Sequence, residues 1–479
     1  MWSSPRDHRR EPSSVRLACT TAAVLVLSTS GCGQEPRQLP DPRDDPPPVA
    51  DPVAETPHAE ARTAYFRDAE FRRVTLTQSL QNPDNGYSRD RLVAYGFGDA
   101  GWELLPLWNP RSVPYRPLEQ ARASAGEWTL PPATPNLWDG VVPTDDAGWQ
   151  ELGRRVFTEL PLRPDDSIAR ALTDPQRASA LGLEQADDGT VPGVVVFEDV
   201  DGRARVGITC ALCHSAVHRG RPWPGLARRN LDFGAVRLDH HRATQTPLDP
   251  ELLARMKRWG PGRADITGDD DEDPVAIPDL WRLLELSALT QAGTIRLNGP
   301  RFVDEARRRA NDLVVLAIRQ ETQVIQANGE RARPPRELAW ALARFVSDLE
   351  PPPRPPSDAA GVREGRALFG QHCRRCHDGP AFSGAPVAAE AVGTDRALAD
   401  SRARGTGKFR PAPLVAVVNA APYFHDGTVP TLADLLDPAR LRPEYRRGVR
   451  QPGPVPGHTF GTELPADQRQ AMIAYLGTL

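Results

Sequence analysis

Apolar residues recur at helical spacing in four stretches of this 479-residue chain. The stretches 149–159 and 338–349 enclose its middle part, and 365–373 and 466–476 enclose its C-terminal part. Apolar side chains three and four positions apart fall on one face of a helix, which is the face that packs against a core. The sequence therefore predicts a mainly α protein in which two long segments each begin and end with a helix.

A strand-like pattern interrupts the first of these segments. Val194–Phe197 and Val206–Ile208 are rich in β-branched residues, and Asp201-Gly202 stands between them. Two such runs around an Asp-Gly turn predict a small β-hairpin insertion. The chain also contains 50 prolines and 38 glycines, which indicate long irregular loops, and a proline-rich break at 351–356 separates the two segments.

Each segment contains one Cys-x-x-Cys-His pentad. Two thiols at this spacing can add to the vinyl groups of one haem, and the adjacent His then supplies an axial ligand to the iron. A zinc site would need both pentads to converge, and a redox dithiol would not need the His twice. The pattern predicts two covalently bound haem c groups. Their attachment residues are Cys210, Cys213 and His214 in the first pentad and Cys373, Cys376 and His377 in the second.

The C-terminal part resembles the small cytochromes c of the mitochondrial type. In those proteins the first and last helices cross closely at a Gly, and an aromatic residue on each helix seals the contact. The matching residues are Gly365, Phe369 and Tyr475, with Gly153 and Phe157 at the same spacing upstream. The resemblance implies two tandem cytochrome c-like domains, which we place at residues 145–350 and 357–479.

Residues 1–32 have the pattern of a bacterial export signal. Basic residues precede the apolar run Leu17–Leu27, and small residues lead to Cys32. A lipoprotein signal would be cut and acylated at this Cys, although Thr29 stands where Leu is usual. We expect a periplasmic lipoprotein that meets the membrane through its lipid anchor alone, with ordinary signal cleavage as the alternative.

Two further segments precede the first predicted haem domain. Residues 33–60 are rich in Pro and acidic residues, which predicts a disordered tether. Residues 61–144 carry several Trp residues, and we expect this segment to wrap around the first haem domain. The net charge of −4 gives no indication of a nucleic-acid partner. The acidic run 269–273 predicts a solvated loop, with a Ca²⁺ site as the alternative.

The sixth ligand distinguishes the two predicted haems. The spacing in the small cytochromes places His458 on the second iron, with His425 as the alternative. Two imidazoles fill both axial positions of the iron, and such an iron is suited to electron transfer. The corresponding position in the first domain holds Asn328, which is not an expected haem ligand, so that sixth site is open or filled from elsewhere. The candidates for filling it are His240, His241 and, with a core role more usual for a lone Met, Met256.

From about residue 145 to its end, the chain resembles the bacterial di-haem cytochrome c peroxidases and their relatives, among them the methylamine-utilisation di-haem enzyme and the di-haem rubber oxygenases. The resemblance rests on the tandem pentads and on Pro422–Gly427 followed by Val429–Leu432, and it is closest to the rubber-oxygenase branch. One haem reacts and the other relays electrons in that superfamily. The peroxidase relatives often carry an Arg-Asn pair just before the turn Pro422–Gly427, which we call the tyrosine turn. Ala416–Asn419 stands there in this chain, so no distal catalytic residue is assigned.

These patterns predict an exported di-haem oxidoreductase. Its first haem would meet peroxide or O₂, and its second haem would exchange electrons with a redox protein. The alternative is a non-catalytic electron-transfer cytochrome, in which His240 or His241 would close the first iron. A weaker possibility is a sensory lipoprotein that binds a gas at an open haem.

Overall fold

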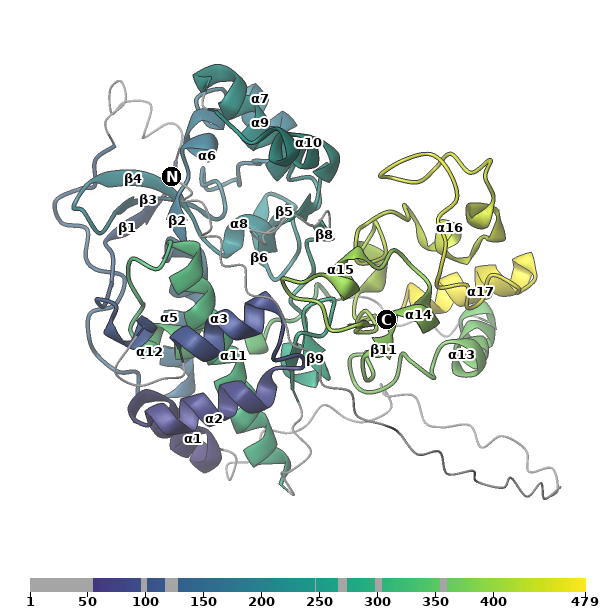
Figure 1. Ribbon diagram of the computed structural model, residues 1–479, viewed down its shortest axis with the longest axis horizontal. Coiled ribbons are helices and arrows are strands. Elements are labelled where there is room, and N and C mark those ends of the chain that lie inside the picture. Colours follow the sequence, from purple (N-terminus) through teal and green to yellow (C-terminus); the bar gives the residue numbers. More distant parts are fainter. Residues whose placement is uncertain are drawn as a thin grey trace, which may run out of the picture. The chain divides into compact units, whose positions relative to one another are not determined.

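The computed structural model describes residues 55–95, 101–116, 128–245, 247–265, 274–297, 304–353 and 360–479, all within one compact unit. These residues are mostly helical with small antiparallel sheets (Figure 1), so the prediction of a mainly α chain is confirmed. None of the helices in these ranges is long and apolar enough to cross a membrane. The export signal, most of the tether and the acidic run 269–273 lie outside the described residues.

The helices divide into long ones that carry the core and short turns that join them. The helices are α1 (Glu55–Arg67), α2 (Ala69–Ser79), α3 (Gly86–Ala94), α5 (Asp146–Glu159), α6 (Asp166–Ala171), α7 (Pro175–Ala180), α8 (Ala211–His214), α9 (Phe233–Thr244), α10 (Pro250–Trp259), α11 (Glu305–Ala327), α12 (Arg336–Ser347), α13 (Ala360–His372), α14 (Ala389–Val392), α15 (Ala397–Asp400), α16 (Leu432–Leu436) and α17 (Ala466–Leu476), with 3₁₀ turns η2 (Gly101–Leu104), η3 (Leu283–Glu285), η4 (Val417–Asn419) and η5 (Pro438–Leu441).

The strands are short. They are β1 (Ser112–Pro114), β2 (Arg163–Pro164), β3 (Val194–Glu198), β4 (Ala204–Ile208), β5 (Ser215–His218), β6 (Arg221–Pro224), β7 (Arg263–Ala264), β8 (Val275–Ala276), β9 (Ala288–Leu289), β10 (Ile295–Arg296), β11 (Val387–Ala388) and β12 (Lys408–Phe409). The predicted hairpin is present as β3 and β4, which pair antiparallel with Val196 opposite Val206. The structure adds β1 and β2 at the edges of this sheet, in the order β1-β3-β4-β2. Both edge strands contain a Pro, which suits an edge and hides a strand from sequence patterns.

Two pairs of helices cross at a glycine in the same way. In the first pair, a Cβ on Gly153 of α5 would lie 2.0 Å from the carbonyl oxygen of Ala341 in α12. The rings of Phe157 and Phe345 pack beside this crossing with their centres 5.4 Å apart. A side chain at the Gly would push the helices apart, so the close contact depends on its absence.

The second crossing repeats this geometry between α13 and α17, which lie side by side in Figure 1. A Cβ on Gly365 would lie 2.0 Å from the carbonyl oxygen of Ala471, and the rings of Phe369 and Tyr475 are 5.3 Å apart. In both crossings the aromatic residue follows the Gly by four positions, which is one helical turn. Residues far apart in the sequence therefore form two matching helix pairs.

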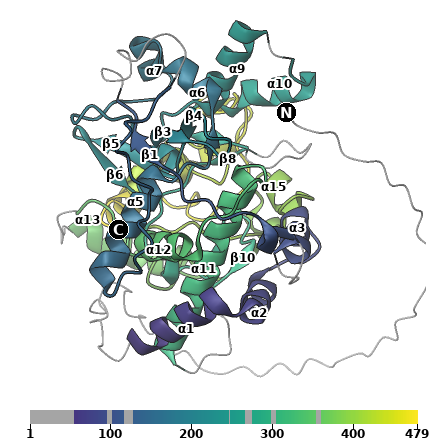
Figure 2. The ribbon, with the colours of Figure 1, turned by 90° about the vertical axis from the view of Figure 1, so that its left-hand side faces the viewer.

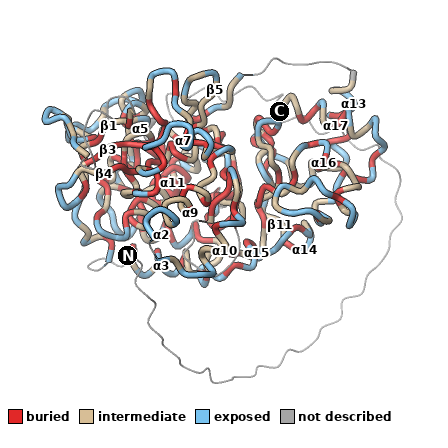
Figure 3. The backbone as a smooth tube through the Cα atoms, turned by 90° about the horizontal axis from the view of Figure 1, so that it is seen from above, coloured by how far each residue is buried: buried red, intermediate tan, exposed pale blue. Residues whose placement is uncertain are grey.

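The N-terminal helices pack on α11, which is drawn as buried in Figure 3. Figure 2 shows α1 and α2 beside α11, and their apolar side chains belong to the same core cluster as those of α5 and α12. At its centre, the buried carboxylate of Glu321 accepts hydrogen bonds from Tyr65 at 2.8 Å and Tyr95 at 2.9 Å. These two hydrogen bonds to one buried carboxylate oxygen help to fix how the N-terminal segment packs on the core.

Candidate haem sites

The first pentad is held in place by hydrogen bonds around His214. Its Nδ1 lies 3.0 Å from the carbonyl oxygen of Pro278, and the backbone N–H of Gly225 donates to the carbonyl of His214 at 2.8 Å. Burial lowers the pKa of His214 to about 4, so the imidazole is neutral at pH 7. A neutral imidazole whose Nδ1–H is bound to a carbonyl presents Nε2 to a metal.

The second pentad has the same arrangement. Nδ1 of His377 lies 3.0 Å from the carbonyl oxygen of Phe382, and burial lowers the pKa of His377. The four pentad cysteines form no disulfide, and burial raises the pKa of Cys210 and of Cys373 to about 12. Neutral thiols beside an oriented imidazole fit covalent haem attachment better than a reactive dithiol, which requires a lowered pKa.

The predicted sixth ligand faces the second pentad. The ring centres of His377 and His458 are 6.2 Å apart, although the two residues come from opposite ends of the C-terminal part. A metal–imidazole bond is about 2.0–2.1 Å long and a ring nitrogen lies about 1.1 Å from the ring centre, so two imidazoles on opposite sides of one metal have centres about 6.2–6.4 Å apart. The spacing of the two rings is therefore compatible with one metal held between them.

Two further features of His458 fit a metal ligand. Its Nδ1 is buried and has no hydrogen-bond partner among the described residues, so no protein contact competes for that atom. Burial, followed by the neighbouring His377, lowers the pKa of His458 to about 4, so this imidazole is also neutral. The residues present at this site therefore fit a haem iron.

The alternative ligand, His425, is placed elsewhere. Its ring stacks on Phe409 with the centres 4.5 Å apart, and its carbonyl accepts from the N–H of Ala276 at 2.8 Å. The residue before it in the tyrosine turn is Phe424, and the ring centre of Phe424 lies 6.0 Å from that of His458. The turn thus meets the second site through Phe424.

His214 has no comparable partner. In the part of the chain that the structure describes, no aromatic or imidazole ring lies within stacking distance of its ring, in contrast to His377. His240 and His241 lie in the last turns of α9, and Met256 of α10 is buried in a small cluster with Leu238 and Trp259. Among the described residues, no ring contact joins His240 or His241 to His214. Nδ1 of His240 is nevertheless buried without a hydrogen-bond partner, as Nδ1 of His458 is, and Val236 of α9 packs in one cluster with Leu212 and Cys213 of the first pentad.

Asn328 ends a helix. It is the C-cap residue of α11, its Nδ2 donates to the carbonyl of Ala332 at 2.8 Å, and its Oδ1 accepts from the N–H of Arg331 at 2.9 Å. Both ends of its amide are therefore used in closing the turn before α12. This role gives a physical reason for an Asn at the position that the sequence comparison aligned with His458.

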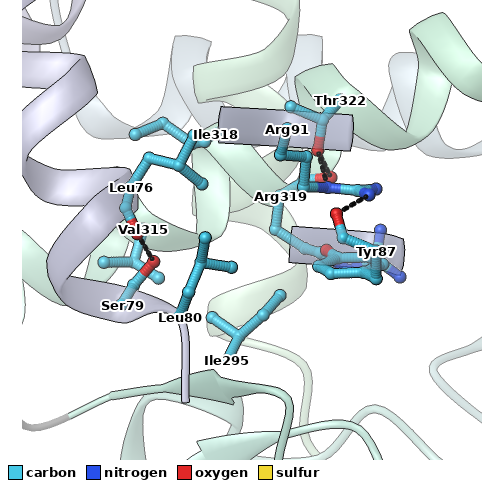
Figure 4. Close-up of a pocket in the computed structure, with 10 residues that line it drawn as sticks. All are labelled: Leu76, Ser79, Leu80, Tyr87, Arg91, Ile295, Val315, Ile318, Arg319 and Thr322. Carbon is cyan, nitrogen blue, oxygen red and sulfur yellow. Dashed lines mark hydrogen bonds between the residues drawn. The ribbon is translucent and has the colours of Figure 1, made fainter. Parts of the chain in front are cut away.

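The helix α11 runs close to the first pentad. Its apolar face packs in the same core cluster as Cys210, and the positive charge of Arg319 is near enough to contribute to the pKa of both Cys210 and His214. Beside Arg319, a cavity of about 10 Å³ lies between α2, α3, α11 and β10 (Figure 4). That space holds about one water molecule, so it is no substrate site.

Two guanidinium groups near the pentads pair with no acidic side chain among the described residues. Arg228 is buried and Arg410 is half-buried. Arg410 donates to the carbonyl of Thr290 and to Ser383, next to Phe382, and its pKa is lowered to about 10 by burial. Arg228 donates to the carbonyls of Pro192 and Ser215, its N–H donates to the carbonyl of Cys213, and burial lowers its pKa to about 10 as well. A buried cation is costly unless a negative charge compensates it.

Haem propionates would supply negative charge at these sites, so the two cations fit the expected cofactor. Sequence reasoning missed both arginines, as well as the carbonyls of Pro278 and Phe382. No local pattern marks a backbone carbonyl as a histidine partner, and 57 of the 59 basic residues are arginines, with Lys257 and Lys408 the exceptions, so single arginines do not stand out. Within the described residues, no group of three or more His, Cys, Asp or Glu side chains is placed to hold a metal ion.

Comparison with known proteins supports a cytochrome c-like protein. A family model described as RoxA-like, cytochrome c-like matches residues 408–447. No curated protein matches the chain. The matched segment contains the tyrosine turn and η5, and it supports a cytochrome c-like, haem-containing redox protein of the rubber-oxygenase-like branch.

Proposed function

We propose that this protein is an exported di-haem c-type cytochrome with oxidoreductase activity. The first haem, attached at Cys210 and Cys213, is the site that meets peroxide or O₂. The second haem, attached at Cys373 and Cys376, is closed by two imidazoles and carries electrons. One observation supports this division most strongly: a second imidazole lies 6.2 Å from the ring of His377, and none of the described residues places a ring across from His214.

Bound haem would supply redox chemistry at both sites and a place for a small oxidant at the first. The chain orients each proximal imidazole through a backbone carbonyl, Pro278 for His214 and Phe382 for His377. Burial keeps both imidazoles neutral and able to bind a metal. The two matching helix crossings, at Gly153 and Gly365, support a cytochrome c-like domain around each haem.

The two attachment sites differ in how they meet solvent. The residues between the first pair of cysteines, Ala211 and Leu212, are each 1% exposed. All four pentad cysteines are half-buried, but between the second pair Arg375 is exposed. Electron transfer falls steeply with distance, so the second haem is the better contact point for a redox partner. Export, periplasmic location and a lipid anchor at Cys32 are supported by the N-terminal sequence pattern.

Spectroscopy of the purified holoprotein tests the proposal. The oxidised protein should show one low-spin and one high-spin ferric haem by EPR, and the reduced protein should bind CO rapidly at one haem of the two. His458→Gly should open the second haem as well, whereas the matched variant His425→Gly should leave its spectrum unchanged. Two low-spin haems in the unaltered protein, with no rapid CO binding, would instead indicate a plain electron-transfer cytochrome.

A further inference from the structure

The loop that carries His458 is fastened by one buried arginine. Arg440, in η5, is 0% exposed, and its guanidinium donates to four backbone carbonyls. These are the carbonyls of Leu435 at 3.0 Å, Val455 at 2.6 Å, Gly457 at 2.8 Å and His458 at 2.8 Å. Three of these carbonyls, those of Val455, Gly457 and His458, belong to the loop that carries His458, which we call the ligand loop. The third of them is the carbonyl of His458 itself.

This arrangement is unusual for a buried cation, because no carboxylate is among these acceptors. Burial lowers the pKa of Arg440, yet a guanidinium stays protonated in proteins, so the full charge is held beside the second haem site. A buried charge without a counter-ion is costly. Its planar fork, however, can satisfy several carbonyls at fixed angles at once, which a lysine cannot do.

Arg440 also reaches the imidazole of His458 through Phe424. The guanidinium carbon of Arg440 lies 5.4 Å from the centre of the Phe424 ring, and that ring lies 6.0 Å from the ring of His458. The contact is a cation–π interaction on one side and an aromatic contact on the other. Phe424 therefore links the tyrosine turn to both the arginine and the ligand.

The ligand loop needs such support because its backbone is strained. His458 has φ of 43° and follows Gly457, which has φ of 80°. A non-glycine residue rarely adopts this left-handed conformation unless its surroundings impose it. The N–H of His458 is held on the other side by the carbonyl of Val392 at 2.6 Å. The loop is thus gripped from both sides at the residue that would bind iron.

We infer that Arg440 is a positioning residue for the axial ligand His458, which it holds through its carbonyl contacts and through Phe424. The inference rests on the proposed bis-His coordination of the second haem. The positive charge of Arg440 has a second consequence: it favours the reduced iron, which carries one positive charge less, and so raises the reduction potential of this haem.

The test separates the fork of Arg440 from its charge. Arg440→Gln removes both, and Arg440→Lys keeps the charge but loses the fixed fork. Arg447→Gln is the matched control, because Arg447 lies on the same segment and pairs with Asp434. Each holoprotein is reduced and mixed with CO, and the rate at which CO displaces the sixth ligand of the second haem is measured beside its reduction potential.

Both Arg440 variants should release the ligand about tenfold faster or more, as the loss of a single charge-assisted hydrogen bond implies. The reduction potential of the second haem should fall in Arg440→Gln and stay close to the original in Arg440→Lys. In any Arg440 variant whose His458 no longer binds the iron, added imidazole should restore a low-spin second haem. Arg447→Gln should change neither readout.

The result that overturns the inference is a set of Arg440 variants that unfold more easily but release the sixth ligand at the original rate. Arg440 would then only stabilise the fold. Failure of the proposed function looks different, because the unaltered protein would itself lack a bis-His haem in its EPR spectrum before any variant is made.

Discussion

Replacing Gly365 with Ala tests the helix crossing that positions the second haem site. The added Cβ would lie 2.0 Å from the carbonyl oxygen of Ala471 and 2.8 Å from the Cβ of Tyr475, whereas real Cβ contacts stay above 3.0 Å. Helix α17 must therefore move away by about 1 Å, and a gap of about 0.5–1 Å forfeits a quarter to a half of each dispersion contact.

The expected loss in unfolding free energy follows from two opposing effects. Overpacking a close contact costs about 1–3 kcal/mol. Ala is more favourable than Gly inside a helix by about 0.8–1.0 kcal/mol, which offsets part of this cost. Gly365→Ala should therefore destabilise the protein by about 0–2 kcal/mol in net terms.

Gly370 provides the control within the same helix. It is exposed, and a Cβ there would meet nothing within 4 Å, so Gly370→Ala should gain about 0.5–1 kcal/mol from helix propensity alone. The assay is urea unfolding of the holoprotein, followed by circular dichroism and by haem absorbance. If Gly365→Ala proves as stable as Gly370→Ala, then α13 and α17 do not cross as closely as described. The interpretation of this crossing as that of a cytochrome c-like domain would then also be wrong.

Three further predictions concern buried charges. Burial, followed by the nearby charge of Arg344, lowers the folded-state pKa of His58 to about 4. As pH falls from about 6.5 to about 4, the unfolded state therefore binds the proton first, and the unfolding free energy should drop by at most about 1.4 kcal/mol per pH unit. His58→Gln should make this slope shallower. Glu321→Ala strands two buried tyrosine hydroxyls and should cost about 3–5 kcal/mol in urea unfolding, and an unchanged midpoint would contradict the buried network. Arg410→Gln removes a buried positive charge and should make the reduction potential of the second haem more negative, as measured by potentiometry. A potential equal to that of the unaltered protein would place Arg410 away from the haem.

The sequence alone determined the features whose physics is local. Covalent haem attachment needs two thiols and an imidazole within five positions, so the pentads at Cys210 and Cys373 could be read without a fold. The spacing of Gly365 and Phe369 reflects one turn of a helix, so a helix with a small and an aromatic residue on one face was predictable. The hairpin β3–β4 was equally local, because its turn and both strands are contiguous.

Only the tertiary structure decided which distant groups meet. It brings the ring of His458 to 6.2 Å from that of His377, turns His425 onto Phe409 and uses Asn328 to close a helix. It also fastens the ligand loop with Arg440. These outcomes depend on packing between segments that are far apart in the chain, and on backbone carbonyls that every residue has. Side-chain identity therefore cannot reveal them, whereas the folded chain fixes them through distance and direction.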